Sequence, residues 1–298
     1  MKKKSFCRLL RLIPLPLLAA PLFFASCSSD DSMTPIDEVK TPQRPISVEV
    51  SEAPFGNTTE ARQLTRAAIT DLTSFSAFTM MTANKDKLSV EKKNGSWVVD
   101  GSWPVGDNTP VTFYAYSNGD YYDNSGTPYI SFSMDEYASA QHDLLVAKNT
   151  VSYNDHQGKV PLTFDHACAA VAFNVQITNT LKTNLGSKLT VNSIVLRNVS
   201  NTGNYYFGTS TWGDVSGSAY YTLTSGITVD TEAQALSSNY LFVIPQSSEA
   251  NGTTGTYLDV TYTFSGQKET SATIPLSVNW EAGKQYTINI KLGTTLIQ

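Results

Sequence analysis

Residues 160–175 read VPLTFDHACAAVAFNV, and this stretch decides the fold class. Apolar and polar residues alternate from Val160 to Phe164, and a second apolar run follows from Ala169 to Ile177. Both runs are typical of β-strands. Similar runs, separated by Gly, Asn, Asp and Ser, continue through most of the chain. The sequence therefore predicts an all-β protein.

The strands expected from this patterning fall into two series. The first series is 75–81, 88–92, 97–99, 111–117, 129–134, 143–148 and 160–164. The second series is 169–177, 191–199, 205–207, 220–223, 240–244, 257–264, 269–276 and 285–292. Only 181–189 has room for a helical turn or two. We expect two tandem β-sandwich domains, 67–165 and 166–298, both of ordinary domain size.

The N-terminus carries the pattern of an export signal, residues 1–26. Five basic residues precede an apolar run, 12–25, that is too short and too rich in proline to span a bilayer. Small residues lead up to Cys27, which predicts a lipoprotein signal peptide and acylation of the Cys27 thiol. An ordinary secretory signal with an incidental cysteine is the alternative. Residues 28–45 are polar, acidic and Pro-rich, as in a solvated tether.

Charge and cysteine content limit the functions open to the chain. The formal charge is −5, and it becomes −10 when the five basic residues of the signal leave. This balance argues against nucleic acid as a partner. Once Cys7 departs and Cys27 takes lipid, only Cys168 remains, so no intramolecular disulfide can form. Cys168 lies in an apolar run and is expected in the core.

Searches for catalytic chemistry find no motif. The sequence has no Gly-x-Ser-x-Gly elbow, phosphate loop or dinucleotide fingerprint. His-Asp neighbours occur at 142–143, 155–156 and 165–166, without the spacing of a helical metal site. Capping, turn or hydrogen-bonding roles account for them equally well. We therefore predict no catalytic residue, no metal and no cofactor.

A separate strand pattern lies upstream of the predicted domains. Residues 46–50 alternate apolar and polar side chains, with Ile46, Val48 and Val50 on one face. A linker of small and polar residues follows and ends at Arg66-Ala67, where a protease would have access. A strand that can be detached here would leave an open groove able to accept a strand from another chain. A disordered tether with chance alternation is the other interpretation.

Several motifs together resemble the fimbrillin family, the lipoprotein subunits of protease-assembled (type V) pili. They are the Cys27 signal, the Thr65-Arg66-Ala67 step, DLLVA at 143–147, VPLTFDHACAAVAFNV at 160–175, LFVIPQ at 241–246 and NWEAGKQYTINIKL at 279–292. The resemblance covers nearly the whole chain.

This resemblance implies two transthyretin-like β-sandwich domains and transport to the outer membrane, where the protein would be exposed at the cell surface. It also implies cleavage by an arginine-specific protease between Arg66 and Ala67, removal of residues 27–66 with the lipid, and assembly with other pilin subunits into a fimbrium by donor-strand exchange. The protein would then be a structural or adhesive subunit with possible ligands on host or bacterial surfaces.

Two points remain open at this stage. Family stalk subunits carry a C-terminal donor extension, whereas only six residues, 293–298, follow the last expected strand. Either the strand 285–292 detaches and serves as the donor, or the subunit has a tip or minor position in the fimbrium.

The runner-up function is a surface-anchored glycan-binding lipoprotein. Its candidate sugar-stacking aromatics are Trp97, Trp103, Tyr121, Tyr122 and Trp212.

Overall fold

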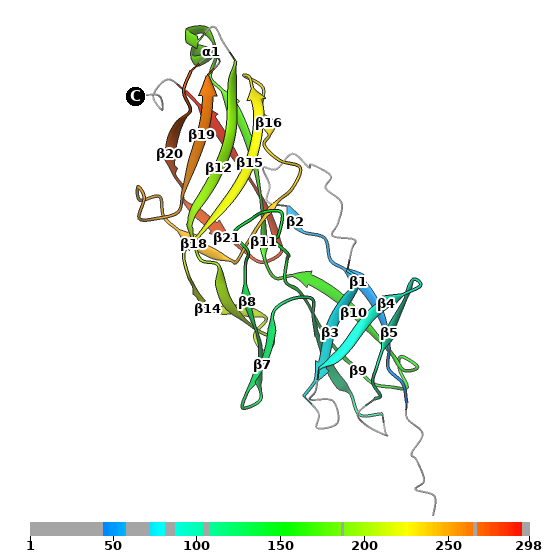
Figure 1. The fold of residues 1–298 in the computed structure, drawn as a ribbon. Helices are drawn as coiled ribbons and strands as arrows, with labels where there is room; N and C mark the ends of the chain where they lie inside the picture. Colours follow the sequence, from blue (N-terminus) through cyan, green and yellow to red (C-terminus); the bar gives the residue numbers. More distant parts are fainter. Residues whose placement is uncertain are drawn as a thin grey trace, which may run out of the picture. The chain divides into compact units, whose positions relative to one another are not determined.

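The computed structural model describes residues 44–57, 72–80, 87–103, 108–185, 188–264 and 267–293. Within them, regular structure is almost entirely β-strand, together with the short helix α1 (Asn179–Leu185) (Figure 1). The all-β prediction is confirmed, and the helix falls where the sequence left room for one. Within these ranges no helix has both the length and the apolar character needed to cross a bilayer.

The first sheet has seven strands in the order β1-β10-β9-β6-β3-β4-β5. Their bounds are β1 (Ser47–Glu52), β3 (Ser74–Thr79), β4 (Leu88–Lys93), β5 (Ser96–Val99), β6 (Val111–Tyr116), β9 (Leu145–Val151) and β10 (Lys159–His166). Neighbours are antiparallel except for β1 and β10. The β4–β5 turn has positive φ at Asn94 (52°) and Gly95 (82°), as a two-residue hairpin requires.

The remaining strands form four further sheets. The second sheet has the order β16-β11-β22-β2, with β17 also paired to β11: β2 (Gly56–Asn57), β11 (Ala169–Ile177), β16 (Gln234–Ala235), β17 (Leu241–Val243), β22 (Lys284–Leu292). The third has the order β15-β12-β19-β20: β12 (Leu189–Val199), β15 (Ala219–Val229), β19 (Tyr257–Phe264), β20 (Thr270–Pro275). The fourth has the order β14-β13-β8-β7: β7 (Asp120–Asn124), β8 (Thr127–Ser133), β13 (Thr202–Tyr206), β14 (Thr211–Ser216). The last pairs β18 (Gln246–Ser248) with β21 (Val278–Trp280).

Two hydrophobic cores hold these sheets. The smaller core lies on the first sheet and includes Val90, Phe113 and Leu162. The larger core gathers side chains of the other sheets, Cys168 among them, and also takes in residues from before position 165, such as Ile130. Cys168 is fully buried, as expected. The division into two sandwiches at residues 165 and 166 stays a prediction.

Six strands escaped the sequence prediction: four of two or three residues, β2, β16, β18 and β21, and two longer ones, β7 (DYYDN) and β14 (TWGDVS). The two longer ones share a composition. Both are rich in Asp, Asn, Gly or Ser, residues that favour turns, and both are the outer strands of the fourth sheet. Their pairing with β8 and β13 stabilises them as strands, because the aromatic side chains between the polar ones pack onto the sheet.

Candidate functional site

β1 is the outermost strand of the first sheet and runs parallel to β10. Residues 47–52 pair one by one with residues 159–164. The pairing continues past the end of the strand, where the Ala53 N–H donates to the Phe164 carbonyl oxygen at 2.8 Å. Residues 47–53 therefore have a main-chain ladder on one side. Just before them the segment is bonded on its other side, where the Ile46 N–H donates to the Gly101 carbonyl oxygen at 3.1 Å and the Trp103 N–H donates to the Arg44 carbonyl oxygen at 2.8 Å.

The side chains of this segment alternate between core and solvent. Ile46 is 6% exposed and belongs to the smaller core, while Val48 and Val50 are half-buried against the same core. All three share one face, as the period of two requires. Full burial of such a side chain contributes roughly 1.5–3 kcal/mol, and two of the three reach only part of that. We call the edge of β10 and the core surface beneath this row the strand-acceptor site.

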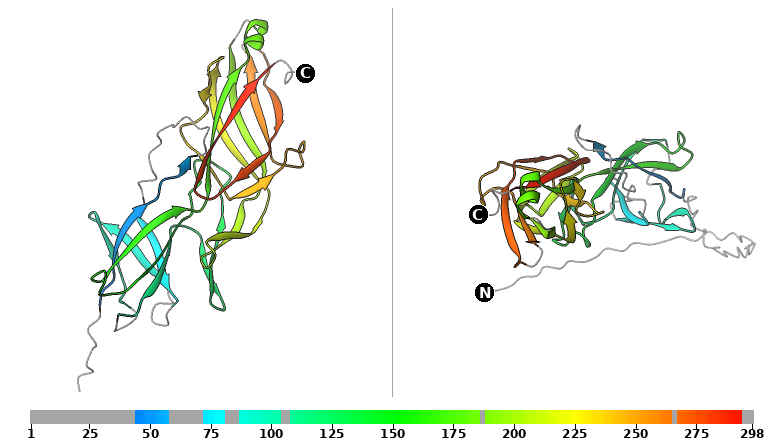
Figure 2. Two further views of the ribbon diagram at one scale, coloured as in Figure 1. Left: turned by 180° about the vertical axis from the view of Figure 1, so that it is seen from behind. Right: turned by 90° about the horizontal axis from the view of Figure 1, so that it is seen from above.

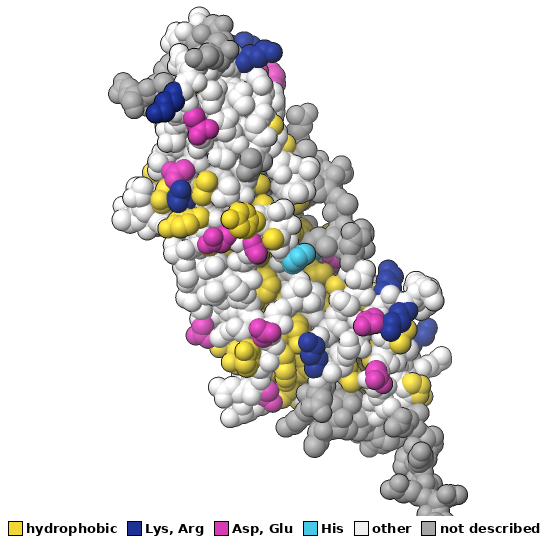
Figure 3. Space-filling model, in the orientation of Figure 1, with side chains coloured by type: hydrophobic (Ala, Val, Ile, Leu, Met, Phe, Trp, Pro, Cys, Tyr) yellow, Lys and Arg dark blue, Asp and Glu magenta, His cyan; other side chains and the backbone are white. Residues whose placement is uncertain are grey.

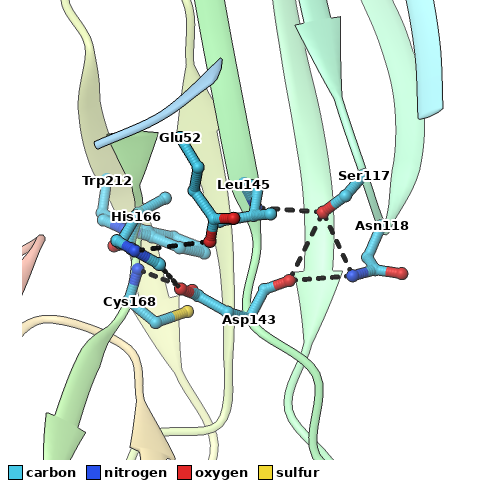
Figure 4. A network of polar contacts seen from close by, with 9 residues as sticks. Glu52, Ser117, Asn118, Asp143, Leu145, His166, Cys168 and Trp212 are labelled. Carbon is cyan, nitrogen blue, oxygen red and sulfur yellow. Dashed lines mark hydrogen bonds and ion pairs between the residues drawn. The ribbon is translucent and has the colours of Figure 1, made fainter. Parts of the chain in front are cut away.

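The inward row of β1 ends on a polar side chain, and so does the inward row of β10. Figure 4 shows these two side chains, Glu52 and His166, facing each other. Glu52 follows Val50 on the inward face, and His166 follows Phe164. Glu52 Oε1 lies 3.7 Å from His166 Nε2, with the two side chains 20% and 4% exposed. Among the described residues, Glu52 Oε1 has no hydrogen-bond partner. Burial raises the pKa of Glu52, and His166 offsets part of that rise.

Asp143 holds the opposite side of the imidazole ring. Its Oδ2 lies 2.6 Å from His166 Nδ1, and its Oδ1 accepts a hydrogen bond from the Cys168 N–H at 3.2 Å. Asn118 Nδ2 donates to the Asp143 carbonyl oxygen at 2.8 Å, which anchors this loop. An ionised Asp143 makes Nδ1 the hydrogen-bond donor, so the other ring nitrogen, Nε2, faces Glu52.

Phe55 covers the flat face of His166. The ring centroids are 3.6 Å apart and the planes are inclined by 16°. The Gly56 N–H then donates to the Gly283 carbonyl oxygen at 2.8 Å, where β2 begins its parallel pairing with β22. Residues 46–57 thus join two sheets, β1 on the first and β2 on the second (Figure 2).

This arrangement is suited to holding a strand and does not resemble a catalytic centre. Burial, with the Asp143 charge nearby, raises the pKa of the Cys168 thiol well above its usual range, so the thiol stays protonated and is a poor nucleophile. No group of three or more His, Cys, Asp or Glu side chains within the described ranges is arranged to hold a metal ion.

The structure describes some of the site residues predicted from the sequence and not others. Cys27, Arg66 and Ala67 lie outside the described residues. Ile46, Val48 and Val50 lie together on the strand-acceptor site. The carboxylate that pairs with His166 is Asp143, 23 positions away, and not the adjacent Asp165. Sequence patterning named both residues but could not pair them, because the pairing depends on how the β9 and β10 segments meet.

Most of the aromatic residues considered for sugar stacking pack against the cores. Trp103 is buried, while Trp97, Tyr121 and Trp212 are half-buried. Tyr122 is 49% exposed, the only one of the five that is largely free of the cores. The indole N–H of Trp212 donates to the Ala167 carbonyl oxygen at 2.6 Å, which fixes that ring in place.

A row of three tyrosines, which the sequence analysis did not identify, lies across the fourth sheet. Tyr122, Tyr129 and Tyr206 sit opposite one another on β7, β8 and β13, with neighbouring ring centroids 5.4 Å apart. The Tyr206 hydroxyl donates to Asp214 Oδ2 at 2.7 Å and lowers the pKa of that carboxyl.

On the face seen in Figure 3, acidic and basic side chains are scattered among polar and hydrophobic ones, with no broad patch of one sign.

The chain was compared with known proteins. A family model described as fimbrillin-like matches residues 56–298. A fimbrial protein from Bacteroides vulgatus has a similar structure, with a TM-score of 0.56 and 18% identity over 84% of this chain and 96% of the other. A proposed cell adhesion protein from Bacteroides ovatus gives a TM-score of 0.52 and 14% identity over 84% and 92%. At these identities the likeness establishes the fold. No curated protein matches the sequence.

Proposed function

Because the chain belongs to the fimbrillin-like family, we propose that it is a non-enzymatic fimbrial subunit that is exported as a lipoprotein, activated by cleavage after Arg66 and assembled with other pilin subunits by strand exchange. Lipid on Cys27 anchors the precursor at the outer membrane with its folded part exposed at the cell surface. Cleavage removes that anchor and frees the subunit for the fimbrium.

The observation that carries this proposal is the position of the N-terminal segment. Residues 46–57 occupy an edge of the first sheet through β1 and an edge of the second through β2. In the sequence, Arg66 lies between β2 and β3. Cleavage there leaves β1 and β2 attached by non-covalent contacts alone. Their departure would bare the edges of β10 and β22, whose free N–H and C=O groups favour an incoming strand.

Cleavage is tested first in cells that assemble the fimbrium. Arg66→Ala should leave the precursor at full length and keep it out of fibres, whereas Arg62→Ala should be processed and assembled normally. N-terminal sequencing of fibre-bound protein should begin at Ala67. Normal incorporation of Arg66→Ala would overturn the cleavage step.

Lipidation is tested with Cys27→Ser and metabolic labelling with a fatty acid. The wild-type precursor should carry label and fractionate with the outer membrane, and the processed subunit should have lost it. Cys168→Ser serves as the control, because a buried thiol cannot be acylated without unfolding. Label that persists on the mature, fibre-bound chain would contradict the removal of residues 27–66.

The tyrosine row gives a specific reason to keep glycan binding as a second candidate function. Aromatic rings beside carboxylate and amide groups are a common composition for sugar sites, and Asn204 joins Tyr206 at Asp214. Tyr122→Ala should abolish saturable binding on a glycan array, whereas Tyr220→Ala, an exposed tyrosine on the third sheet, should not change it. Equal binding by both variants would exclude this site.

A further inference from the structure

The inward rows of β1 and β10 lie side by side and share a layout. Each row has three apolar residues at alternate positions, and each then ends on a polar one. The β1 row is Ile46, Val48, Val50 and Glu52, and the β10 row is Val160, Leu162, Phe164 and His166. In the observed register Val48 lies opposite Val160, Val50 opposite Leu162 and Glu52 opposite Phe164, and the Glu52 carboxylate reaches past Phe164 to His166.

We propose that His166 fixes the register of the strand in this site, and that a strand inserted by another subunit must place a carboxyl or carboxamide group beside His166 Nε2, at the position of Glu52. This inference rests on the strand exchange proposed above and identifies the chemistry of the incoming segment. Asp143 is the positioning residue, because it holds the ring through Nδ1 and leaves Nε2 to face the strand.

The apolar row by itself does not define one register. A parallel ladder repeats every two residues, so a shift of two positions restores the backbone hydrogen bonds and still places apolar side chains on apolar surface. Val48 and Val50 are identical side chains two residues apart. Shifted either way, they remain compatible with the smaller core. A strand with this row alone could slide.

The polar pair makes such shifts costly. Moved by two residues in one direction, Glu52 would lie opposite Leu162, which is 1% exposed, and its carboxylate would enter the apolar core. Moved in the other direction, Val50 would take the place of Glu52 beside His166. In both cases His166 Nε2 loses the carboxyl group that lies 3.7 Å from it and faces an apolar side chain instead, which is costly for a buried polar group. Fixing register is a well-attested role of buried polar pairs.

Phe55 adds a second fixed point three residues after Glu52. Its ring lies on the His166 imidazole at 3.6 Å and also stacks near Phe242, at 6.3 Å between centroids. The incoming segment is therefore expected to repeat the spacing seen here, with apolar residues at alternate positions, a carboxyl or carboxamide side chain two residues after the last of them, and an aromatic ring three residues later.

The pair also makes docking dependent on a proton. The titratable groups that face His166 are Asp143 from the loop before β9 and Glu52 from β1, and no basic side chain contacts the ring within the described residues. With Nδ1 donating to Asp143, the Nε2 lone pair faces the Glu52 carboxyl group at 3.7 Å, and burial of that carboxyl group favours its protonated form. Docking therefore takes up a proton when the free strand is ionised, and it weakens as the pH rises.

Register can be measured in the intact chain by disulfide cross-linking, in a background with Cys7 and Cys27 changed to Ser. The exposed pair Ser51→Cys/Thr163→Cys reports the observed register, because Ser51 Oγ and Thr163 Oγ1 are 3.0 Å apart. The pair Glu49→Cys/Thr163→Cys reports a shift of two residues. We expect the first pair to dominate in the wild-type background. Adding Glu52→Leu should lower the ratio of the two by about tenfold.

Glu52→Gln is the matched control. Its side-chain amide can donate to a neutral His166 Nε2, much as a protonated Glu52 would, so the observed register should persist while its dependence on pH disappears. An unchanged cross-link ratio in Glu52→Leu would overturn the inference, as would an equal fall in Glu52→Leu and Glu52→Gln. Neither result depends on cleavage or assembly.

A second arm tests the incoming strand. After treatment of the whole chain with an arginine-specific protease, a labelled peptide of residues 44–57 is added, alongside peptides with Leu or Gln at position 52. The peptide with Glu should bind about tenfold more tightly than the one with Leu. Equal binding of Glu and Leu peptides overturns the role of His166 and leaves strand exchange standing. Binding of no peptide, with the intact-chain result positive, overturns the strand exchange and leaves His166 as the register residue of the precursor.

Discussion

Two parallel strand pairs, β1 on β10 and β22 on β11, use the same kind of hydrogen-bond ladder but are held very differently. β1 has one strand neighbour and pairs over 47–52, and Ile46 just before it is the only buried side chain of its row. β22 lies between β11 and β2, pairs with β11 over 285–292 and buries Ile290 and Leu292.

Side-chain burial and the number of paired strands therefore determine which of the two strands can detach from its sheet. The ladder bonds are similar in the two pairs, so they do not distinguish β1 from β22. Release of β1 breaks one ladder and the few main-chain bonds of residues 44–46 to residues 101–103, and it exposes a short apolar row. Release of β22 breaks two ladders and opens the larger core. The two-residue strand β2 covers only the start of β22, and no other described strand pairs with the rest of that edge.

The largest expected effect comes from the firmly held strand. Ile290→Ala should lower the free energy of unfolding of the whole described fold by about 2–5 kcal/mol, because it opens a cavity in the larger core. Denaturant unfolding with a global spectroscopic probe measures this. Ile288→Ala, at a half-buried position on the same strand, should cost less. A loss no larger for Ile290→Ala than for Ile288→Ala would break the comparison.

The next effect should be local to the detachable strand. Ile46→Ala should destabilise the docking of β1 by about 2 kcal/mol, since it removes the one fully buried side chain of its row. Hydrogen exchange should show β1 amides losing protection while those of β22 keep theirs. Glu49→Ala, at an exposed position, is the control. An equal loss of protection in β22 would mean that β1 is no more detachable than β22.

Removal of the ring that covers His166 should have a smaller effect. Phe55→Ala should weaken the attachment of residues 53–56 by about 1 kcal/mol, because a stacked pair contributes that much beyond its buried area. Phe55→Leu keeps most of the apolar volume and separates stacking from burial. Exchange of the Ala53 and Gly56 amides is the measurement. If Leu restored wild-type protection, stacking on His166 would contribute nothing.

The smallest effect is the dependence of β1 docking on pH. Burial raises the pKa of Glu52 in the docked strand above its ordinary value. The contribution of Glu52 to docking is therefore fully present below that ordinary value and is lost as the pH rises through the raised pKa. Exchange of β1 amides, corrected for intrinsic rates, should speed up over this range in the wild type and not in Glu52→Gln. A dependence of the opposite sign would contradict the proposed uptake of a proton on docking.

Much of the fold could be predicted from local pattern. The alternation in Val160 to Phe164 and the apolar run after it become β10 and β11, and the Asn94-Gly95 signal becomes the β4–β5 turn. Strands β7 and β14 could not be predicted, because their polar residues favour turns and only pairing with β8 and β13 makes them strands. The tyrosine row, in which Tyr122 is exposed and Tyr129 and Tyr206 are half-buried, escaped detection because it too depends on the pairing of β7, β8 and β13.

The candidate site also has features that local pattern predicts and features that depend on distant contacts. The alternation of Ile46, Val48 and Val50 predicts a strand with one apolar face, and the structure contains that strand at a sheet edge. No local signal shows that it lies parallel to β10, or that its row ends beside His166. Ser51 and Thr163 are 112 residues apart in the sequence, yet their side chains are in contact. No local pattern near either residue predicts that contact.

By itself the sequence determined the all-β class, the core position of Cys168 and the face of the N-terminal strand, because period-two alternation and turn residues act over a few neighbouring positions. Tertiary structure alone decided which strands are outermost, which histidine is buried and which carboxylates it meets. Those properties depend on the packing of segments far apart in the chain, where backbone pairing and core burial select one arrangement among many compatible with the same local pattern.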